Sequence, residues 1–363
     1  IDSSAVVGLM AGHTNTPVTT CAIGFDSKRF DEVHWAKKVA EQFKTDHHEF
    51  TVKDNVAESL GSIARFFDEP FADPSFVPTY FVSQLARQKV TVALAGDGGD
   101  ENFAGYSKYY TDQVENQLRG LFPAGIRHKL FPGLARLAGM VNSGPTRKAK
   151  SLLGTLALEP DEAFFITNSF FRRDVWNDLV KGELKRETRD YDPADITRAH
   201  YKNANTDDHL SSILYTDIKT YLPGDILVKV DRMSMANSLE TRAPLLDYRV
   251  VEYAAQVPAA LKLHGKEKKY ILKKAFERML PEDILYRKKM GFSVPLANWL
   301  RHELRPTVEQ LLLSSNSGAA NFFEPAGIRK LWQKHLAGDD QFTQELWSLL
   351  AFELWWQQYQ VNA

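Results

Sequence analysis

The sequence LAGDGGDENFAGY, Leu94–Tyr106, marks the end of a strand and the start of a helix. It follows the apolar run Val90–Ala93, so we expect a strand to finish where the glycines begin. Asp97, Asp100 and Glu101 stand among four glycines in this stretch. Carboxylates this close repel one another, and glycine-rich backbone loses conformational entropy when it is ordered. The stretch therefore calls for a function that offsets these two costs.

A cation and a nucleotide would supply such a function. Carboxylates on a glycine-bent loop suit Mg²⁺, a hard cation that takes oxygen ligands. The N–H groups of Gly96, Gly98 and Gly99 would be open to a nucleotide. A plain turn between strand and helix is the alternative. The alternating ligand spacing of an EF-hand is absent.

The first 110 residues alternate between strand and helix patterns. Helical spacing is found at 3–11, 31–43, 56–67 and 76–88, and β-branched or alternating runs at 18–25, 47–52 and 90–95. Such alternation predicts an α/β fold with a doubly wound parallel sheet. Ligands of these sheets bind at the carboxyl ends of the strands, where the glycine loop would lie.

The strand signal fades after about residue 110, and residues 111–363 are expected to be mainly helical. We interpret 137–151 as a polar, basic, mobile connection and 172–190 as a charged helical surface. The aromatic stretch 346–356 is expected in the core rather than around a cofactor. The chain thus divides into a nucleotide-binding part, 1–110, and a helical part, 111–363.

Composition narrows the class of protein. The 363 residues carry a net charge of −1, which favours neither a nucleic acid nor a membrane as partner. Cys21 is the one cysteine, so an internal disulfide is ruled out and a reducing, cytoplasmic location is expected. No apolar run reaches the roughly 18–20 residues of a membrane span.

The opening residues, Ile1–Ser4, read as a helix start without a lead-in strand, and we expect the sequence to be a fragment. Asp2, Ser3 and Ser4 would offer hydroxyl and N–H groups to an anion and a carboxylate to a cation. Simple helix capping by Ser3 and Ser4 is the alternative.

Two lysines and one dense charged segment are further candidates. Lys269 and Lys289 could stabilise a developing phosphate charge, or be ordinary surface lysines. Segment 229–250 mixes Asp231, Arg232, Glu240, Arg242 and Asp247 with apolar residues. An internal ion-pair network beside the site is the favoured interpretation, and direct substrate contact the alternative. His47 and His48 are adjacent on a strand and would point to opposite faces, which disfavours metal binding.

Five blocks in order resemble the synthetase domain of the glutamine-hydrolysing asparagine synthetase family, across the whole chain. They are IDSS (1–4), DEPFADPS (68–75), LAGDGGDENFAGY (94–106), SLETRAPLLD (238–247) and RKKMGFS (287–293). IDSS is similar to the end of that family's pyrophosphate loop. The resemblance implies an adenine nucleotide alpha-hydrolase (PP-loop) fold.

The resemblance also assigns roles. Asp2 and Asp100 would hold Mg²⁺, and Ser3 with Ser4 would contact the pyrophosphate. Ile23, Gly24, Gly96 and Gly98 would contact the nucleotide. Lys269 and Lys289 match the family's phosphate-side lysines. Asp97 stands where asparagine synthetases usually have Glu, beside the amine and the acyl-adenylate.

The implied reaction joins a carboxylate to ATP, releases pyrophosphate, and then transfers ammonia to give an amide and AMP. The ammonia would come from an N-terminal glutaminase domain that this chain lacks, and a homodimer is left open. The sequence departs from the family pattern at Ala95, Asn102, Ala104 and Lys108 as well as at Asp97. These departures concern the acceptor more than ATP.

Several functions therefore stay open. The acceptor is aspartate, or another carboxylate such as one on a polysaccharide or a peptide natural product. An intramolecular amide former like β-lactam synthetase is disfavoured by Asp97, where those relatives tend to have Tyr. A non-catalytic nucleotide-binding scaffold is disfavoured because Asp2, Asp100, Lys269 and Lys289 are all present.

Overall fold

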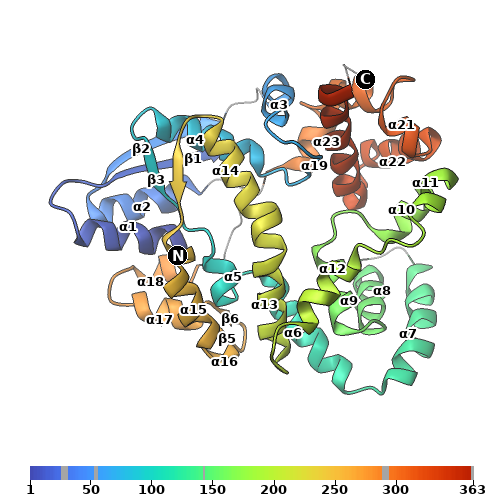
Figure 1. Ribbon diagram of the computed structural model, residues 1–363, viewed down its shortest axis with the longest axis horizontal. Helices are drawn as coiled ribbons and strands as arrows, with labels where there is room; N and C mark the ends of the chain where they lie inside the picture. The colour runs from blue at the N-terminus through green and yellow to red at the C-terminus, as the bar shows by residue number, and fades with distance from the viewer. Residues whose placement is uncertain (26–31, 53–55, 142–143, 288–293, 361–363) are drawn as a thin grey trace.

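The computed structural model describes the chain except for residues 26–31, 53–55, 142–143, 288–293 and 361–363. Figure 1 shows α1 (Asp2–Gly12) and α2 (Val33–Phe43) at one end and the hairpin of α7 (Ala124–Gly139) and α8 (Gly144–Leu156) at the other. The N-terminal elements alternate as the sequence predicts. They are α1 Asp2–Gly12, β1 Thr19–Phe25, α2 Val33–Phe43, β2 Asp46–Val52, α3 Val56–Ala64, α4 Phe76–Arg87, β3 Val92–Leu94 and α5 Gly99–Phe103.

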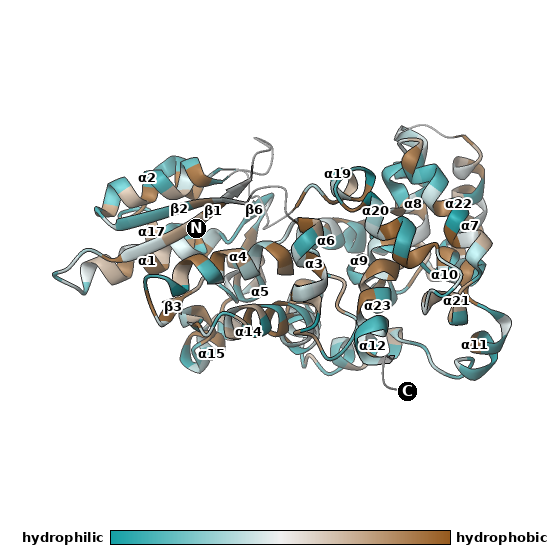
Figure 2. Cartoon of the chain, turned by 90° about the horizontal axis from the view of Figure 1, so that it is seen from above, coloured by the Kyte–Doolittle hydropathy of each residue, from teal (hydrophilic) through white to brown (hydrophobic). Residues whose placement is uncertain are grey.

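Both strand pairs in this part are parallel. Strand β1 pairs with β2 from Thr19 opposite Asp46 to Phe25 opposite Val52. Helix α2 contacts β1 on one side of this pair, and α4 contacts it on the other (Figure 2). The expected α/β class is confirmed, whereas the described strands form three two-stranded sheets rather than one wide sheet: these two parallel pairs and an antiparallel pair of β5 (Leu263–His264) with β6 (Glu267–Lys268).

The second pair contains a strand that the sequence pattern did not indicate. Strand β3 pairs with β4, Glu240–Arg242, which lies inside the charged block 238–247. None of its three residues, Glu240, Thr241 and Arg242, is apolar, so the alternation typical of a strand is missing. Two of the three side chains are exposed. This strand is defined only by its backbone pairing with β3, and such pairing leaves no pattern in the local sequence.

The remainder of the chain is mainly helical, as expected. Its elements are α6 Ser107–Gly120, α7 Ala124–Gly139, α8 Gly144–Leu156, α9 Pro160–Asn168, α10 Arg173–Leu179, α11 Gly182–Glu187, α12 Ala194–Lys202, α13 His209–Lys219, η1 Leu222–Ile226, α14 Leu227–Met235, η2 Pro244–Leu246, α15 Tyr248–Gln256, α16 Ala259–Lys262, β5 Leu263–His264, β6 Glu267–Lys268, α17 Tyr270–Phe276, α18 Glu282–Leu285, α19 Leu296–Arg301, α20 Arg305–Thr307, η3 Val308–Leu312, α21 Ala319–Phe322, α22 Pro325–Leu336, η4 Asp340–Phe342 and α23 Thr343–Gln360.

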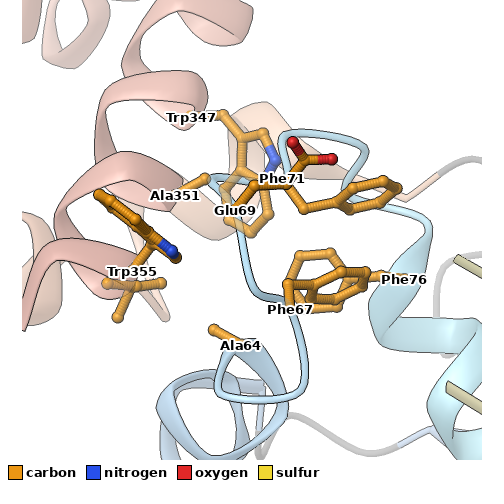
Figure 3. A pocket seen from close by; sticks show the side chains of 9 residues that line it. Ala64, Phe67, Glu69, Phe71, Phe76, Trp347, Ala351 and Trp355 are labelled. Carbon is orange, nitrogen blue, oxygen red and sulfur yellow. The ribbon is translucent and has the colours of Figure 1, made fainter. Parts of the chain in front are cut away.

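One large core cluster joins the two parts of the chain. It includes Ile23 of β1 and Phe76 of α4 together with Trp347 and Leu350 of α23. Trp347 stacks on Phe76 with the ring centroids 6.0 Å apart. The prediction that 346–356 belongs to the core is confirmed. A cavity of about 10 Å³ beside these rings has room for roughly one water molecule, so it is a packing defect rather than a ligand site (Figure 3).

Two local expectations are wrong. Helix α7 ends at Gly139 and α8 begins at Gly144, so most of 137–151 is helical rather than a mobile connection. Helix α1 already begins at Asp2, and neither Ser3 nor Ser4 caps it. Segment 172–190 is a mostly exposed helical surface, as expected, and consists of the two short helices α10 and α11 with Val180 between them in a backbone bridge to Phe323.

Candidate active site

The glycine loop follows β3 directly. The N–H of Ala95 still donates to the carbonyl of Arg242, at 2.8 Å, and extends the parallel pairing by one residue. The chain then turns at Gly98, whose φ of +86° lies in the left-handed region that favours glycine. Helix α5 begins at Gly99, so the strand–loop–helix order predicted from Leu94–Tyr106 is confirmed.

Glycine in this loop permits contacts that any side chain would block. A Cβ atom on Gly96 would lie 2.6 Å from the backbone N of Ser3. A Cβ atom on Gly99 would collide with the carboxylate of Asp2, and one on Gly105 with Asp100 and Lys269. The loop thus packs its bare backbone against the start of α1 and against Lys269.

Lys269 lies between the two carboxylates predicted to hold the metal. Its Nζ atom is 2.8 Å from Oδ1 of Asp100, and it forms a second ion pair with Asp2. Lys269 is only 3% exposed. Burial alone would lower the pKa of Lys269, but Asp2 and Asp100 outweigh this effect and raise it. Its backbone, at φ 54°, donates to the carbonyl of Phe103 and fixes the side chain's origin at the end of α5.

The carboxylates fit a hard cation in their donor chemistry. Within the described residues, Oδ1 of Asp2 is buried and accepts no hydrogen bond, so it retains capacity for a ligand. No group of three or more His, Cys, Asp or Glu residues gathers in the part of the chain that the structure describes. Mg²⁺ is commonly held by one or two carboxylates together with phosphates and water. Asp2 and Asp100 are sufficient for that kind of site, but not for a metal cage made by protein alone.

Asp97 lies on the same loop in a different environment. Burial raises the pKa of Asp97, the nearby Asp2 and Asp100 raise it further, and Lys229 opposes them. Asp2 and Asp100 are both paired with Lys269. Asp97 has a raised proton affinity instead. This arrangement separates Asp97 from Asp100 in chemistry although they are three residues apart.

The remaining predicted site residues lie on β1, on α1 or outside the described residues. Ile23 and Gly24 are buried near the carboxyl end of β1, with Ile23 in the main core, so only their backbones could contact a nucleotide. Ser3 is exposed and Ser4 half-buried on α1. Lys289 lies outside the described residues.

The charged segment 229–250 does not form the expected internal network. Arg232 pairs with Asp68, Arg242 with Glu240 and Arg249 with Asp247, and each pair is substantially exposed. Beside the loop the segment contributes apolar and backbone packing and, through its first residue Lys229, a buried ion pair with Asp73. Leu246 covers Gly98, and the carbonyl of Leu245 accepts from Nδ2 of Asn102 at 2.9 Å.

The sequence did not predict the contacts of a buried polar cluster beside the loop. Nζ of Lys229 lies 2.6 Å from Oδ2 of Asp73 and 2.8 Å from Oγ of Ser75. Burial would raise the pKa of Asp73, but Lys229 and Ser75 hold it below its usual value. Burial and the adjacent Asp73 raise the pKa of Asp225 to about 8. DEPFADPS and segment 229–250 were both singled out, but nothing local indicates that they meet.

A half-buried lysine, Lys108, continues this cluster. Nζ of Lys108 is 2.6 Å from Asp217 and 2.6 Å from Asn168, and it lies 4.0 Å from the ring centroid of Tyr221. Cation–π contact and the ion pair together hold this ammonium group in a dry environment. Lys108, a departure from the family pattern, is thus fully engaged in packing next to α5.

A model of the family described as asparagine synthase matches residues 1–357 of the chain. The chain belongs to the asparagine synthase family. It is similar to "Asparagine synthetase [glutamine-hydrolyzing] 1" of Bacillus subtilis, with 32% identity over 360 residues, which cover 98% of this chain and 54% of that protein. The family resemblance drawn from the five sequence blocks is therefore confirmed.

Other relatives of this asparagine synthase family member are similar over the same region. "Putative asparagine synthetase [glutamine-hydrolyzing]" of Mycobacterium tuberculosis H37Rv is 32% identical over 357 residues, 98% of this chain and 53% of that protein. "Amidase chyE" of Penicillium rubens is 25% identical over 377 residues, 94% and 55% of the two chains. The chain spans about half the length of these relatives. The match identifies an asparagine synthase-type, ATP-dependent amide ligase domain.

Proposed function

We propose that the chain activates a carboxylate by adenylation at the loop Gly96–Gly105 and then forms an amide with ammonia, as in asparagine formation. The observation that carries the proposal is the buried Lys269 held between Asp2 and Asp100. A lysine and two carboxylates at a glycine loop suit a site where phosphate charge shifts during reaction. The relatives named as glutamine-hydrolysing asparagine synthetases add support.

In the proposed reaction, an oxygen of the substrate carboxylate attacks the α-phosphorus of ATP, and pyrophosphate departs. Mg²⁺, when bound by Asp2 and Asp100, would offset the negative charge of the phosphates. Lys269 is poised to neutralise phosphate oxygens, since its ammonium group has a raised pKa and stays protonated. The family resemblance assigns Lys289, which lies outside the described residues, to neutralising the charge of the departing pyrophosphate.

Asp97 is assigned to the second half of the reaction. Ammonia attacks the activated carbonyl, AMP leaves, and a proton must be removed from the new nitrogen. Because burial raises the pKa of Asp97, its carboxylate is a better proton acceptor than an exposed aspartate. Asp is one methylene shorter than Glu, so a substitution at this position changes the acceptor pocket more than the ATP site.

The test compares two variants of the same loop in the full polypeptide. Exchange of labelled pyrophosphate into ATP is measured with a panel of carboxylates led by aspartate. Asp100→Asn should reduce exchange by roughly 100-fold or more, because it removes a carboxylate from the phosphate side. Asp97→Asn should retain most of the exchange but form amide at least ~10-fold more slowly.

Each outcome has a defined meaning. Exchange with aspartate supports an asparagine-forming enzyme, and exchange with another carboxylate keeps the chemistry and changes the substrate. A chain that binds ATP but exchanges with no carboxylate contradicts the proposal and favours the scaffold. Equal exchange by wild type and Asp100→Asn contradicts the assignment of the metal carboxylates.

A further inference from the structure

Helix α7 carries an apolar stripe on its outer side. Ile126, Leu130, Leu134 and Leu137 recur at helical spacing and are 46%, 53%, 39% and 60% exposed. The residues that flank the helix continue the exposed apolar surface: Leu121, Phe122, Met140 and Val141. Of the 22 large apolar side chains exposed in the described residues, eight lie between 121 and 141. Contiguous exposure of this kind marks an interaction surface.

The inner side of α7 already secures the helix to the molecule. Arg127, Phe131 and Ala135 are buried there, and Phe131 packs with Leu156 of α8. The guanidinium of Arg127 donates to the carbonyl of Leu156 at 3.2 Å. The outer stripe is therefore not needed for folding of the hairpin, and Figure 1 shows α7 at the edge of the molecule.

The charge of this region is one-sided. Residues 116–158 contain seven Lys and Arg and no Asp or Glu, in a chain whose net charge is −1. Arg119 and Arg127 are buried against backbone carbonyls. The other five are exposed: Lys129, Arg136, Arg147, Lys148 and Lys150. Within the described part of the chain, none of these five forms an ion pair.

We propose that the α7–α8 hairpin binds the surface of an anionic lipid bilayer. The apolar stripe of α7 enters the boundary between headgroups and acyl chains, and the five exposed basic residues contact the lipid phosphates. Two observations select this partner: aliphatic side chains stand in one row along a helix, and residues 116–158 carry basic but no acidic side chains, while the adjacent Glu159 is paired with Arg127 and His128. The described residues contain no candidate membrane-spanning helix.

The test is co-sedimentation of the full polypeptide with vesicles. Vesicles of phosphatidylcholine with phosphatidylglycerol should bind the wild type, and vesicles of phosphatidylcholine alone should bind it far less. Leu130→Gln/Leu134→Gln/Leu137→Gln should weaken binding by roughly tenfold or more, because three exposed aliphatic side chains are lost. Lys129→Gln/Arg136→Gln/Lys148→Gln should weaken it similarly and reduce its dependence on salt.

A matched control changes exposed apolar residues elsewhere. Ile166→Gln/Ile196→Gln removes side chains that are 42% and 53% exposed outside the hairpin, and should bind like the wild type. Circular dichroism and pyrophosphate exchange, which do not depend on lipid, verify that each variant is folded. A wild type that stays in the supernatant with anionic vesicles overturns the proposal. So does a leucine variant that changes a dimer into a monomer without any lipid binding, since the stripe then joins two copies of the chain.

Discussion

The glycine loop and the α7–α8 hairpin use charge in opposite ways. At the loop, the buried Lys269 forms ion pairs with the half-buried Asp2 and Asp100. At the hairpin, the basic side chains are exposed, and the segment contains no acidic residue at all. Paired charges in a dry site are fixed for chemistry, whereas exposed charges of one sign attract a partner at a distance. The net charge of −1 averages these two regions and conceals both.

The two regions also use glycine differently. Gly105 lies where a Cβ atom would overlap Asp100 and Lys269, while Gly133 of α7 has no atom within 4 Å of that position. Gly105 permits close approach, and Gly133 only costs helix stability. The comparison between the regions can therefore be tested with substitutions of the same chemical size.

The largest effect on stability is expected at Asp112. This carboxylate is buried, but it has no lysine ion pair like the one between Asp100 and Lys269. Burial, with a contribution from Glu115, raises the pKa of Asp112 to about 7. Because the folded chain holds the proton of Asp112 more tightly than the unfolded chain does, the contribution of this residue to the free energy of unfolding is greatest below pH ~4. It falls as the pH rises from there to about 7. Asp112→Asn should abolish this decline and be more stable than wild type at pH 8 by on the order of 3 kcal/mol.

Urea unfolding between pH 4 and pH 8 measures this difference. Asp190→Asn is the control, because its side chain is 89% exposed and should leave the pH profile unchanged. Parallel profiles for wild type and Asp112→Asn would show that Asp112 ionises normally in the folded chain.

A smaller effect is expected for glycine. Gly105→Ala should lower the free energy of unfolding by about 1–3 kcal/mol, since the added methyl group displaces Asp100 or Lys269. Gly133→Ala should be neutral or stabilise by up to about 1 kcal/mol. Thermal melting and pyrophosphate exchange are measured for both, and only Gly105→Ala should lose exchange. Equal behaviour of the two variants would mean that the loop is not closely packed on its neighbours.

The sequence predicts local features of this fold well. The spacing of apolar residues places α1 to β3 within a few residues of their bounds, because amphipathic helices and β-branched strands are short-range patterns. The glycine loop was recognised because its composition is costly without a function. Strand β4 was missed because its three residues become a strand only through pairing with β3.

The side-chain partners of the site were harder to predict. Lys229 meets Asp73 across 156 residues of sequence, and the spacing of neither residue indicates the other. Segment 229–250 was expected to hold its charges inside, yet Arg242 and Arg249 pair with near neighbours at the surface. The charged side chains of such a segment can face either the solvent or the interior, and tertiary packing decides which.

The central claim is that Lys269 acts on the phosphates of ATP together with Asp2 and Asp100. The most direct measurement is pyrophosphate exchange by Lys269→Met, compared with Lys266→Met, which changes an exposed lysine three residues earlier. Rates are expressed per folded molecule, determined by circular dichroism, with Lys269→Arg as a variant that keeps the charge. Lys269→Met should lose roughly 100-fold or more of the exchange, while Lys266→Met should retain it. Similar exchange by the two Met variants would show that Lys269 does not act on the phosphates.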